Sequence, residues 1–346
     1  MTLERPDLSQ VSPAVLAYIE TLEAELEELR ETRGNRTAGV ERPLPPLEPN
    51  EPPTTLNVIT VSRNGLAKRT PRHLYARQHR GGMGIFDLDV EADDPPVHLL
   101  VADQSQDLLI VTSQGRVFRL PVEQVAAGPV RSRGESLPNK LPLNAGERLA
   151  LILPHRREGY LTLVTDQGHV RRFRYHYFRD DMAPGTVLYD VRQHGRPVTA
   201  AWTSGNDDLF LATRLGKAIR FPENKVTTMG VTGVRLDQGD LVVGVAGVND
   251  KSGILLLSAD GRGTVRRMLG FTANKAPGAG GKVAIKADEI SAMTSVGKKE
   301  DIFIISRLSK IIRFAAEEIP PKEGVVQGVN CMALRGDEVV AVTASG

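Results

Sequence analysis

Short apolar runs recur between residues 56 and 346, and each is followed by a polar turn and a second short run that carries Lys or Arg. Runs that are rich in Val, Ile, Leu and Thr and end at Gly, Asn or Asp are typical of β-strands joined as hairpins. Six copies of this unit align, at intervals of 50, 53, 48, 47 and 46 residues. Their turns are placed at Gly65, Gly115, Gly168, Gly216, Gly263 and Ser309.

A second element recurs within the same period and consists of a Leu, a Gly and an acidic residue that precede β-branched residues. It is found at residues 143–148, 236–243 and 334–340, and is typical of a turn that enters a strand. Each period then supplies about four short strands, which is one blade of a propeller. Residues 56–346 are therefore predicted to be all-β and to form a six-bladed β-propeller of four-stranded blades.

The pattern before residue 56 is different and predicts a short helix followed by a linker. Ser12 and Pro13 form a helix start, and apolar residues then follow at the heptad spacings of 4, 3, 4 and 3. The heptad positions are Val15, Ile19, Leu22, Leu26 and Leu29. Residues 1–34 are expected to hold this amphipathic helix, and the proline-rich residues 35–55 are expected to form a stiff linker.

So short a helix is marginal in water without a partner. It either packs on its own domain or frays, or it forms a short coiled coil that makes the protein a homo-oligomer.

Net charge is only +2, but its distribution along the chain is informative. Residues 1–56 hold 5 Lys/Arg and 11 Asp/Glu, which leaves 39 Lys/Arg and 31 Asp/Glu in the remainder. A basic body suggests a polyanionic partner.

Every copy of the hairpin carries Lys or Arg shortly after its turn, and rotation from blade to blade would place these residues at one height on the rim. We call the resulting set the basic belt and predict that it contacts DNA phosphates. The alternative is that exposed strands carry basic residues to protect their edges. The belt comprises Lys68, Arg69, Arg116, Arg119, Arg171, Arg172, Lys217, Arg220, Arg266, Arg267, Lys310 and Arg313.

Several motifs resemble one known family. Residues 68–71 followed by Tyr75, and the segments 213–221 and 231–236, resemble the C-terminal β-pinwheel domain of the gyrase A protein and of its topoisomerase IV counterpart. Residues 78–84 resemble that family's seven-residue box, Gln-Arg-Arg-Gly-Gly-Arg-Gly. The residues of the box in this chain are Gln78, His79, Arg80, Gly81, Gly82, Met83 and Gly84.

The resemblance implies that the box closes the propeller between its first and last blades and lets double-stranded DNA wrap around it. His79 and Met83 stand where the family has arginines, which leaves Arg80 as the fixed cation and implies a weaker grip on phosphate. The glycine-rich segment from Lys275 to Lys282 has a similar composition. It is either a second basic contact or a flexible connection.

The sequence offers no catalytic chemistry. The family's long N-terminal region with its DNA-cleaving tyrosine has no counterpart, and Tyr175, which follows Arg174, lies inside the third repeat and is interpreted as structural. The single cysteine, Cys331, excludes an internal disulfide, and no cofactor or metal site is expected. No long apolar run or secretory signal is present, so a cytoplasmic, nucleoid-associated protein is expected.

The predicted function is non-catalytic, largely sequence-independent binding of double-stranded DNA, with bending or wrapping around the basic rim. Such a protein would be architectural or would modulate DNA topology. Two alternatives remain. One is a propeller that binds other proteins, and the other is a separately encoded accessory protein that assembles with a type IIA topoisomerase core.

Overall fold

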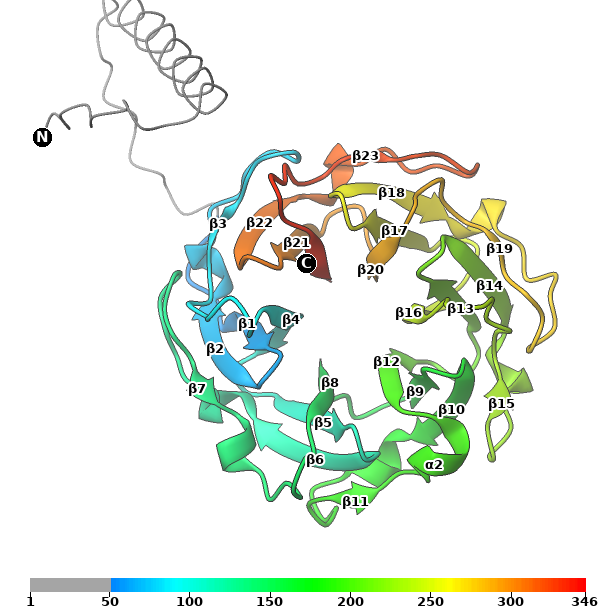
Figure 1. Cartoon of the computed structure of the whole chain (residues 1–346), viewed down its shortest axis with the longest axis horizontal. Helices are drawn as coiled ribbons and strands as arrows, with labels where there is room; N and C mark the ends of the chain where they lie inside the picture. Colours follow the sequence, from blue (N-terminus) through cyan, green and yellow to red (C-terminus); the bar gives the residue numbers. More distant parts are fainter. Residues whose placement is uncertain (1–50) are drawn as a thin grey trace, which may run out of the picture. The chain divides into compact units, whose positions relative to one another are not determined.

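The computed structural model describes residues 51–346, which form a ring of six β-sheets around a central channel (Figure 1). Every sheet has four antiparallel strands, and α2 (Val191–His194) is the one α-helix within this range. The predicted six-bladed propeller is confirmed. The predicted helix with its heptad residues, and residues 35–50 of the predicted linker, lie outside the described residues.

Each blade runs from an inner strand beside the channel, through the two strands of a hairpin, to a two-residue strand at the outer edge (Figure 1). The inner strands are β4 (Pro96–Asp103), β8 (Leu149–Pro154), β12 (Pro197–Thr203), β16 (Val242–Val248), β20 (Ile290–Val296) and β24 (Val339–Ser345). The first hairpin strands are β1 (Leu56–Ser62), β5 (Asp107–Thr112), β9 (Tyr160–Thr165), β13 (Asp208–Thr213), β17 (Gly253–Ser258) and β21 (Asp301–Ser306). The second hairpin strands are β2 (Leu66–Pro71), β6 (Arg116–Pro121), β10 (His169–Arg174), β14 (Lys217–Pro222), β18 (Arg262–Arg267) and β22 (Lys310–Ala315).

The outer strands are β3 (Ile85–Phe86), β7 (Glu135–Ser136), β11 (Thr186–Val187), β15 (Val231–Thr232), β19 (Lys282–Val283) and β23 (Val329–Asn330). A 3₁₀ helix follows each hairpin: η1 (Arg72–Leu74), η2 (Val122–Gln124), η4 (Tyr175–Phe178), η5 (Glu223–Lys225), η6 (Met268–Gly270) and η7 (Ala316–Glu318). A further 3₁₀ helix, η3 (Pro138–Lys140), follows β7.

The hairpin turns require a residue with positive φ, which glycine adopts without steric cost. In the fifth blade this residue is Gly261 (φ 84°), whereas Gly263, the predicted turn residue, lies within β18 and pairs with Leu257. The prediction placed that turn two residues too late. Ser309 adopts φ 61° at the sixth turn, where its hydroxyl donates to the Leu88 carbonyl and accepts from the Leu88 amide.

The hairpin strands are apolar at nearly every position because each blade is packed on both of its faces. In β5, for example, Leu108 and Ile110 pack against the first blade, whereas Leu109 and Val111 pack against the third. Six such clusters of fully buried side chains fill the six interfaces between neighbouring blades. Burial on both faces explains the continuous apolar runs in the sequence.

The outer strand of each blade is supplied by the blade that follows it in the chain. Thus β7, which follows β6, pairs with β2 of the first blade, and β3 pairs with β22 of the last blade. Ring closure therefore uses the same strand exchange as every other interface.

Residues 78–84 run along this closure. Gln78 donates its amide to the Arg313 carbonyl (2.7 Å), Gly81 donates to the Cys331 carbonyl (2.8 Å), and Ala333 donates to the Gly82 carbonyl (2.9 Å). These bonds tie the chain leaving the first blade to the fifth and sixth blades.

Candidate functional site

The basic belt divides into residues that hold the blades together and residues that reach solvent. Lys68, Arg220, Arg266 and Arg313 are at most 4% exposed. The prediction that all the belt residues face outward is therefore wrong for these four, because their side chains lie within or between blades.

Five arginines form what we call the arginine row, at the fourth position of the second hairpin strand. Arg220 donates from Nη1 to the carbonyls of Met268 (2.8 Å) and Phe271 (3.1 Å), at the 3₁₀ helix of the next blade. Arg313 makes the equivalent bonds to Arg72 (3.1 Å) and Tyr75 (3.0 Å) across the closure. The row comprises Arg69, Arg119, Arg172, Arg220 and Arg313.

An acidic or amide residue twelve positions earlier holds most members of the row. Arg220 pairs with Asp208 (2.9 Å), Arg313 pairs with Asp301 (2.7 Å), and Arg119 pairs with Asp107. Asn57 lies 3.5 Å from Arg69. The blade interfaces therefore use charge that was predicted from the sequence to contact DNA.

Lys68, on β2 of the first blade, also forms a buried ion pair that holds the ring together. Its Nζ lies 2.8 Å from Oδ1 of Asp87, which also accepts hydrogen bonds from Thr60 (2.6 Å) and Tyr75 (2.7 Å). Asp87 directly follows the closing strand β3, so this buried pair fastens the closure.

The remaining belt residues are half-buried or exposed. Arg116 pairs with Glu147 (2.6 Å) and Lys217 pairs with Asp237, next to the hairpin turns. Lys310 lies over the Phe86 ring (5.7 Å), Arg267 is exposed 3.7 Å from Glu323, and Arg171 is half-buried.

The box contributes less free charge than expected. Arg80 donates from Nε to the Glu318 carbonyl (2.9 Å) and from Nη1 to the Asn330 carbonyl (3.1 Å). His79 is 99% exposed 3.4 Å from Glu318, and Met83 is 54% exposed. Gly84 has φ +71°, and a Cβ there would lie 2.7 Å from the Ile311 carbonyl oxygen, which explains the need for glycine.

A local accumulation of positive charge lies beside Phe271. Lys282 stands 4.2 Å from the centre of this ring, and Arg266 stands 5.7 Å from it. Burial, with the charges of Arg266 and Lys275, lowers the pKa of Lys282. Among the described residues no carboxylate pairs with these three side chains, so an anion would relieve their mutual repulsion.

The outer edge of the ring is its one surface with a clear excess of positive charge. The segments that lead into the outer strands hold ten Lys/Arg and six Asp/Glu, and one of these acids, Asp87, is buried. These outer segments are residues 75–90, 126–143, 179–189, 227–236, 272–285 and 320–333.

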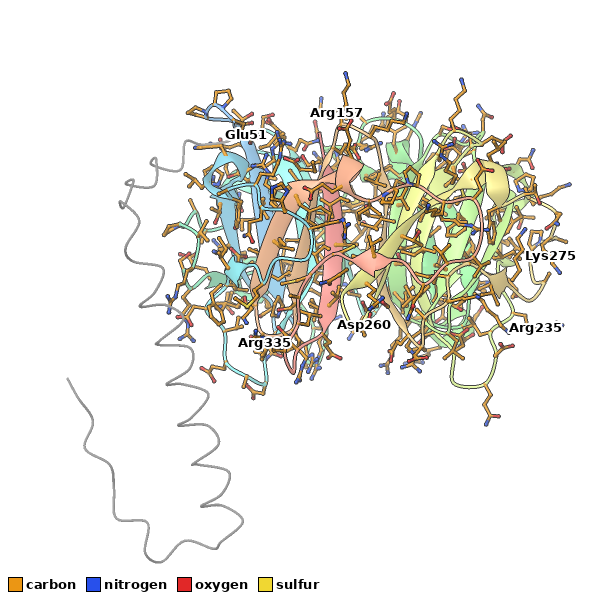
Figure 2. The ribbon with its side chains drawn as sticks, turned by 90° about the horizontal axis from the view of Figure 1, so that it is seen from above. Glu51, Arg157, Arg235, Asp260, Lys275 and Arg335 are labelled. Atoms are coloured by element: carbon orange, nitrogen blue, oxygen red, sulfur yellow. The ribbon has the colours of Figure 1, made fainter. Side chains whose placement is uncertain are left out.

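Neither face of the ring has such an excess. Figure 2 shows Glu51 and Arg157 on one face, Asp260 and Arg335 on the opposite face, and Lys275 and Arg235 at the outer edge. The loops of the first face hold five Lys/Arg and eight Asp/Glu, and the turns and loops of the second hold 12 and 13. The first set is residues 103–107, 155–159, 204–208, 249–253 and 297–301. The second set is the turns 63–66, 113–116, 166–169, 214–217, 259–262 and 307–310 and the loops 91–95, 144–148, 190–196, 237–241, 286–289 and 335–338.

Besides Arg80, seven cations at the outer edge have no carboxylate partner within 4 Å among the described residues. Three of the seven, Arg171, Lys275 and Lys282, were predicted from the sequence, whereas the other four lie outside the basic belt. The seven are Arg131, Arg171, Arg174, Arg235, Lys275, Lys282 and Lys322.

Neither a metal-holding cluster nor a membrane-spanning helix is found in the described part of the chain. No group of three or more His, Cys, Asp or Glu side chains in residues 51–346 is arranged to hold a metal ion. None of the helices in this range is long and apolar enough to cross a membrane.

The model of the family described as DNA gyrase C-terminal domain, beta-propeller, matches residues 56–102, 106–135, 207–249 and 300–345. The DNA gyrase A protein of Ureaplasma parvum serovar 3 is 30% identical over 294 residues, which cover 82% of this chain and 35% of that protein. The chain thus spans about a third of the length of the curated relatives it matches.

Solved structures show the same fold. A DNA gyrase A C-terminal domain superposes with a TM-score of 0.72 at 20% identity, over 84% of this chain and 99% of that one. The C-terminal domain of a DNA topoisomerase IV superposes with a TM-score of 0.59 at 21% identity, over 84% and 93%.

Proposed function

This chain belongs to the family of DNA gyrase C-terminal domains, and on that premise we propose that its propeller binds double-stranded DNA along its outer edge and bends it, without catalysing a reaction. The protein would act in the cytoplasm, on the nucleoid. The observation that carries the proposal is the charge of the outer segments, where Lys/Arg outnumber Asp/Glu by ten to six.

The contacts would be made to phosphates and not to base edges. The outer edge presents two-residue strands and loops, so it offers no recognition helix to the major groove. Lys and Arg side chains bind phosphate oxygens of any sequence and release counterions as they do so. Bending a short duplex costs on the order of 1–6 kcal/mol, which contacts to several blades would offset.

A plasmid topology assay tests the bending. Relaxed plasmid is incubated with the protein and a nicking-closing enzyme, and the linking number is then read on a gel. A shift in linking number supports wrapping. Binding without a shift would restrict the proposal to DNA binding, and no binding at about 50 mM salt would favour the protein-binding alternative.

Charge reversal locates the interface. Arg131→Glu, Arg235→Glu and Lys275→Glu together should abolish duplex binding in a fluorescence anisotropy titration. The matched control, Arg63→Glu, Lys251→Glu and Lys298→Glu, changes the same net charge on the two faces of the ring and should keep most of the affinity. Equal losses in the two triple variants would mean that the affinity follows net charge and not an interface at the outer edge.

Oligomerisation through Val15, Ile19, Leu22, Leu26 and Leu29 stays a prediction. A coiled coil there would let one particle hold two or more DNA segments. Leu22→Asp with Leu26→Asp should then lower the mass of the full chain in light scattering, and an unchanged mass would reject the coiled coil. Assembly with a topoisomerase core is a separate prediction, tested by co-purification.

A further inference from the structure

A groove of about 450 Å³ lies at the outer edge between the second and third blades, and is lined by residues of β10, of β11 and of the chain that precedes β15. Figure 1 shows β11 and β15 at the outside of the ring. Arg171, Arg172 and Arg174 of β10 line it, together with the aromatic rings of Tyr160 and Tyr177. No Asp or Glu lines it. The groove thus combines positive charge with flat apolar surface.

The arginines of the groove are only weakly neutralised by the described part of the chain. Arg172 stands 3.7 Å from Glu223, whereas Arg171 and Arg174 have no ion pair among residues 51–346. The Nε atom of Arg171 is buried and has no hydrogen-bond partner there. A buried donor without an acceptor is costly, so this group is suited to receiving an anion.

Aromatic rings lie beside all three guanidinium groups. Arg172 and Arg174 lie 4.9 Å and 5.8 Å from the centre of the Tyr160 ring, and Arg171 lies 5.7 Å from that of Phe173. Cation–π contacts orient an arginine without cancelling its charge. Its N–H groups therefore remain available to a phosphate.

An exposed aromatic ring stands beside these cations. The Tyr177 side chain is 66% exposed, with its ring edge-on to Phe173 at 6.5 Å. Val187, across the groove on β11, is 64% exposed. Large apolar side chains exposed next to arginines are a combination that single-stranded nucleic-acid sites use, because a base stacks on the ring while the arginine binds the backbone.

The other blades serve as an internal comparison. The first residue of the hairpin is Asp107, Asp208 and Asp301 in the second, fourth and sixth blades, but Tyr160 in the third. The last residue of the second strand is Pro in the first, second and fourth blades and Ala315 in the sixth, whereas the third blade has Arg174 and the fifth has Arg267. Tyr160 and Arg174 both line the groove, so in this blade an aromatic ring stands where three other blades have the Asp partner of the arginine row.

We infer that this groove binds an unstacked nucleotide of single-stranded or locally melted DNA, with the base on Tyr177 and the phosphate on Arg171 and Arg174. A perfect duplex provides phosphates but keeps its base faces stacked, so it cannot use the tyrosine. The inference shares with the proposed function only the placement of DNA on the outer edge.

The test uses the full chain and three labelled DNAs in anisotropy titrations: an oligo(dT), a perfect duplex, and the same duplex with a central unpaired bubble. Wild-type protein should bind the bubble more tightly than the duplex. Tyr177→Ala should weaken oligo(dT) and bubble binding about tenfold while changing duplex affinity less than about twofold. Arg174→Gln should weaken all three, and most strongly the two with unpaired bases.

Arg235→Gln is the matched control, since Arg235 is an outer-edge cation away from the groove, and it should weaken the duplex and the bubble equally. Circular dichroism melting confirms that each variant is folded.

Equal affinity of the wild type for bubble and duplex, or an equal loss for both in Tyr177→Ala, would overturn the inference while leaving duplex binding intact. Binding of oligo(dT) without binding of the duplex would contradict the proposed function and support the inference that the groove binds an unpaired nucleotide. If the protein does not bind unpaired DNA, the assignment of the groove to a nucleotide is wrong, and a polypeptide becomes the expected ligand of the groove.

Discussion

At the scale of single residues, position in the hairpin decides whether an arginine serves the fold or the surface. Arg220 and Arg235 are only fifteen residues apart in the chain, yet Arg220 is 4% exposed with Asp208 and Asp250 on its guanidinium, and Arg235 is exposed. The constant spacing of twelve residues between Asp or Asn and Arg was visible in the sequence. It would have marked the arginine row as structural, because a DNA-binding arginine needs no carboxylate partner at a fixed spacing.

Arg220→Ala should lower the free energy of unfolding by roughly 3–5 kcal/mol, because it leaves the acids and carbonyls of the interface without their donor. Urea denaturation measures this. Arg235→Ala, the control at an exposed position, should change stability by less than about 0.5 kcal/mol. Similar losses for both would contradict the assignment of the row to the blade interfaces.

Arg266 is a buried arginine outside the arginine row, and no carboxylate of the described chain pairs with it. Its side chain is 4% exposed, its Nε and Nη1 have no hydrogen-bond partner in the described chain, and burial lowers its pKa. Arg266→Met should therefore be neutral or stabilising by about 1 kcal/mol, since an unpaired buried charge is removed. Arg313→Met, which breaks a satisfied pair, should destabilise strongly in the same thermal melts.

His98 on β4 gives a pH dependence with a defined sign. Burial lowers its pKa from the usual 6.5 to about 4, so the folded chain holds it neutral while the unfolded chain takes up a proton below about pH 6.5. The stability that His98 contributes is complete above pH 6.5 and is lost progressively as the pH falls towards 4, by at most about 3 kcal/mol. His98→Gln should flatten this part of a stability–pH curve measured by urea denaturation, and an unchanged slope would contradict the burial effect.

At the scale of elements, the sequence repeat predicted the architecture correctly but missed some of its details. The period, the hairpins and the six blades followed from apolar runs that are buried on both faces. The turn of the fifth blade was predicted at the wrong residue. Gly263 aligns with the turn glycines of the other copies, but it lies within β18, and the residue with positive φ is Gly261. The exchange of outer strands was also missed, since a two-residue strand leaves no hydrophobic pattern.

The closing element can be tested through Cys331, which is fully buried beside the box and whose pKa burial raises to about 12. Its thiol should be unreactive to a disulfide reagent in the folded protein, since the thiolate is the reactive form. Gly84→Ala, which crowds the Ile311 carbonyl, should speed the reaction about tenfold by weakening the closure.

Gly324→Ala is the control, because a Cβ there meets no atom within 4 Å. Labelling at the same rate in both variants would show that Cys331 becomes accessible by another route.

At the scale of the whole molecule, binding through many dispersed cations predicts a steep dependence on salt. The logarithm of duplex affinity should fall linearly with the logarithm of salt concentration, with a slope of about −0.9 for each phosphate neutralised. Arg235→Gln should make that slope shallower by about one, whereas Arg63→Gln, on a face of the ring, should leave it unchanged. A slope near zero in the wild type would exclude a phosphate-based interface.

The exchange of outer strands has a consequence for circular permutation. Each blade lends its neighbour the same two-residue strand, and Arg72 donates to the carbonyl of Gly346 (2.6 Å), so residues at the beginning and end of the ring already touch. A permutant that joins residue 346 to residue 51 and opens the chain between β7 and β8 keeps all six exchanges. Such a ring has no unique seam, so under the proposed function the point where DNA enters would be set by the distribution of charge around the circle and not by the order in which the blades are encoded.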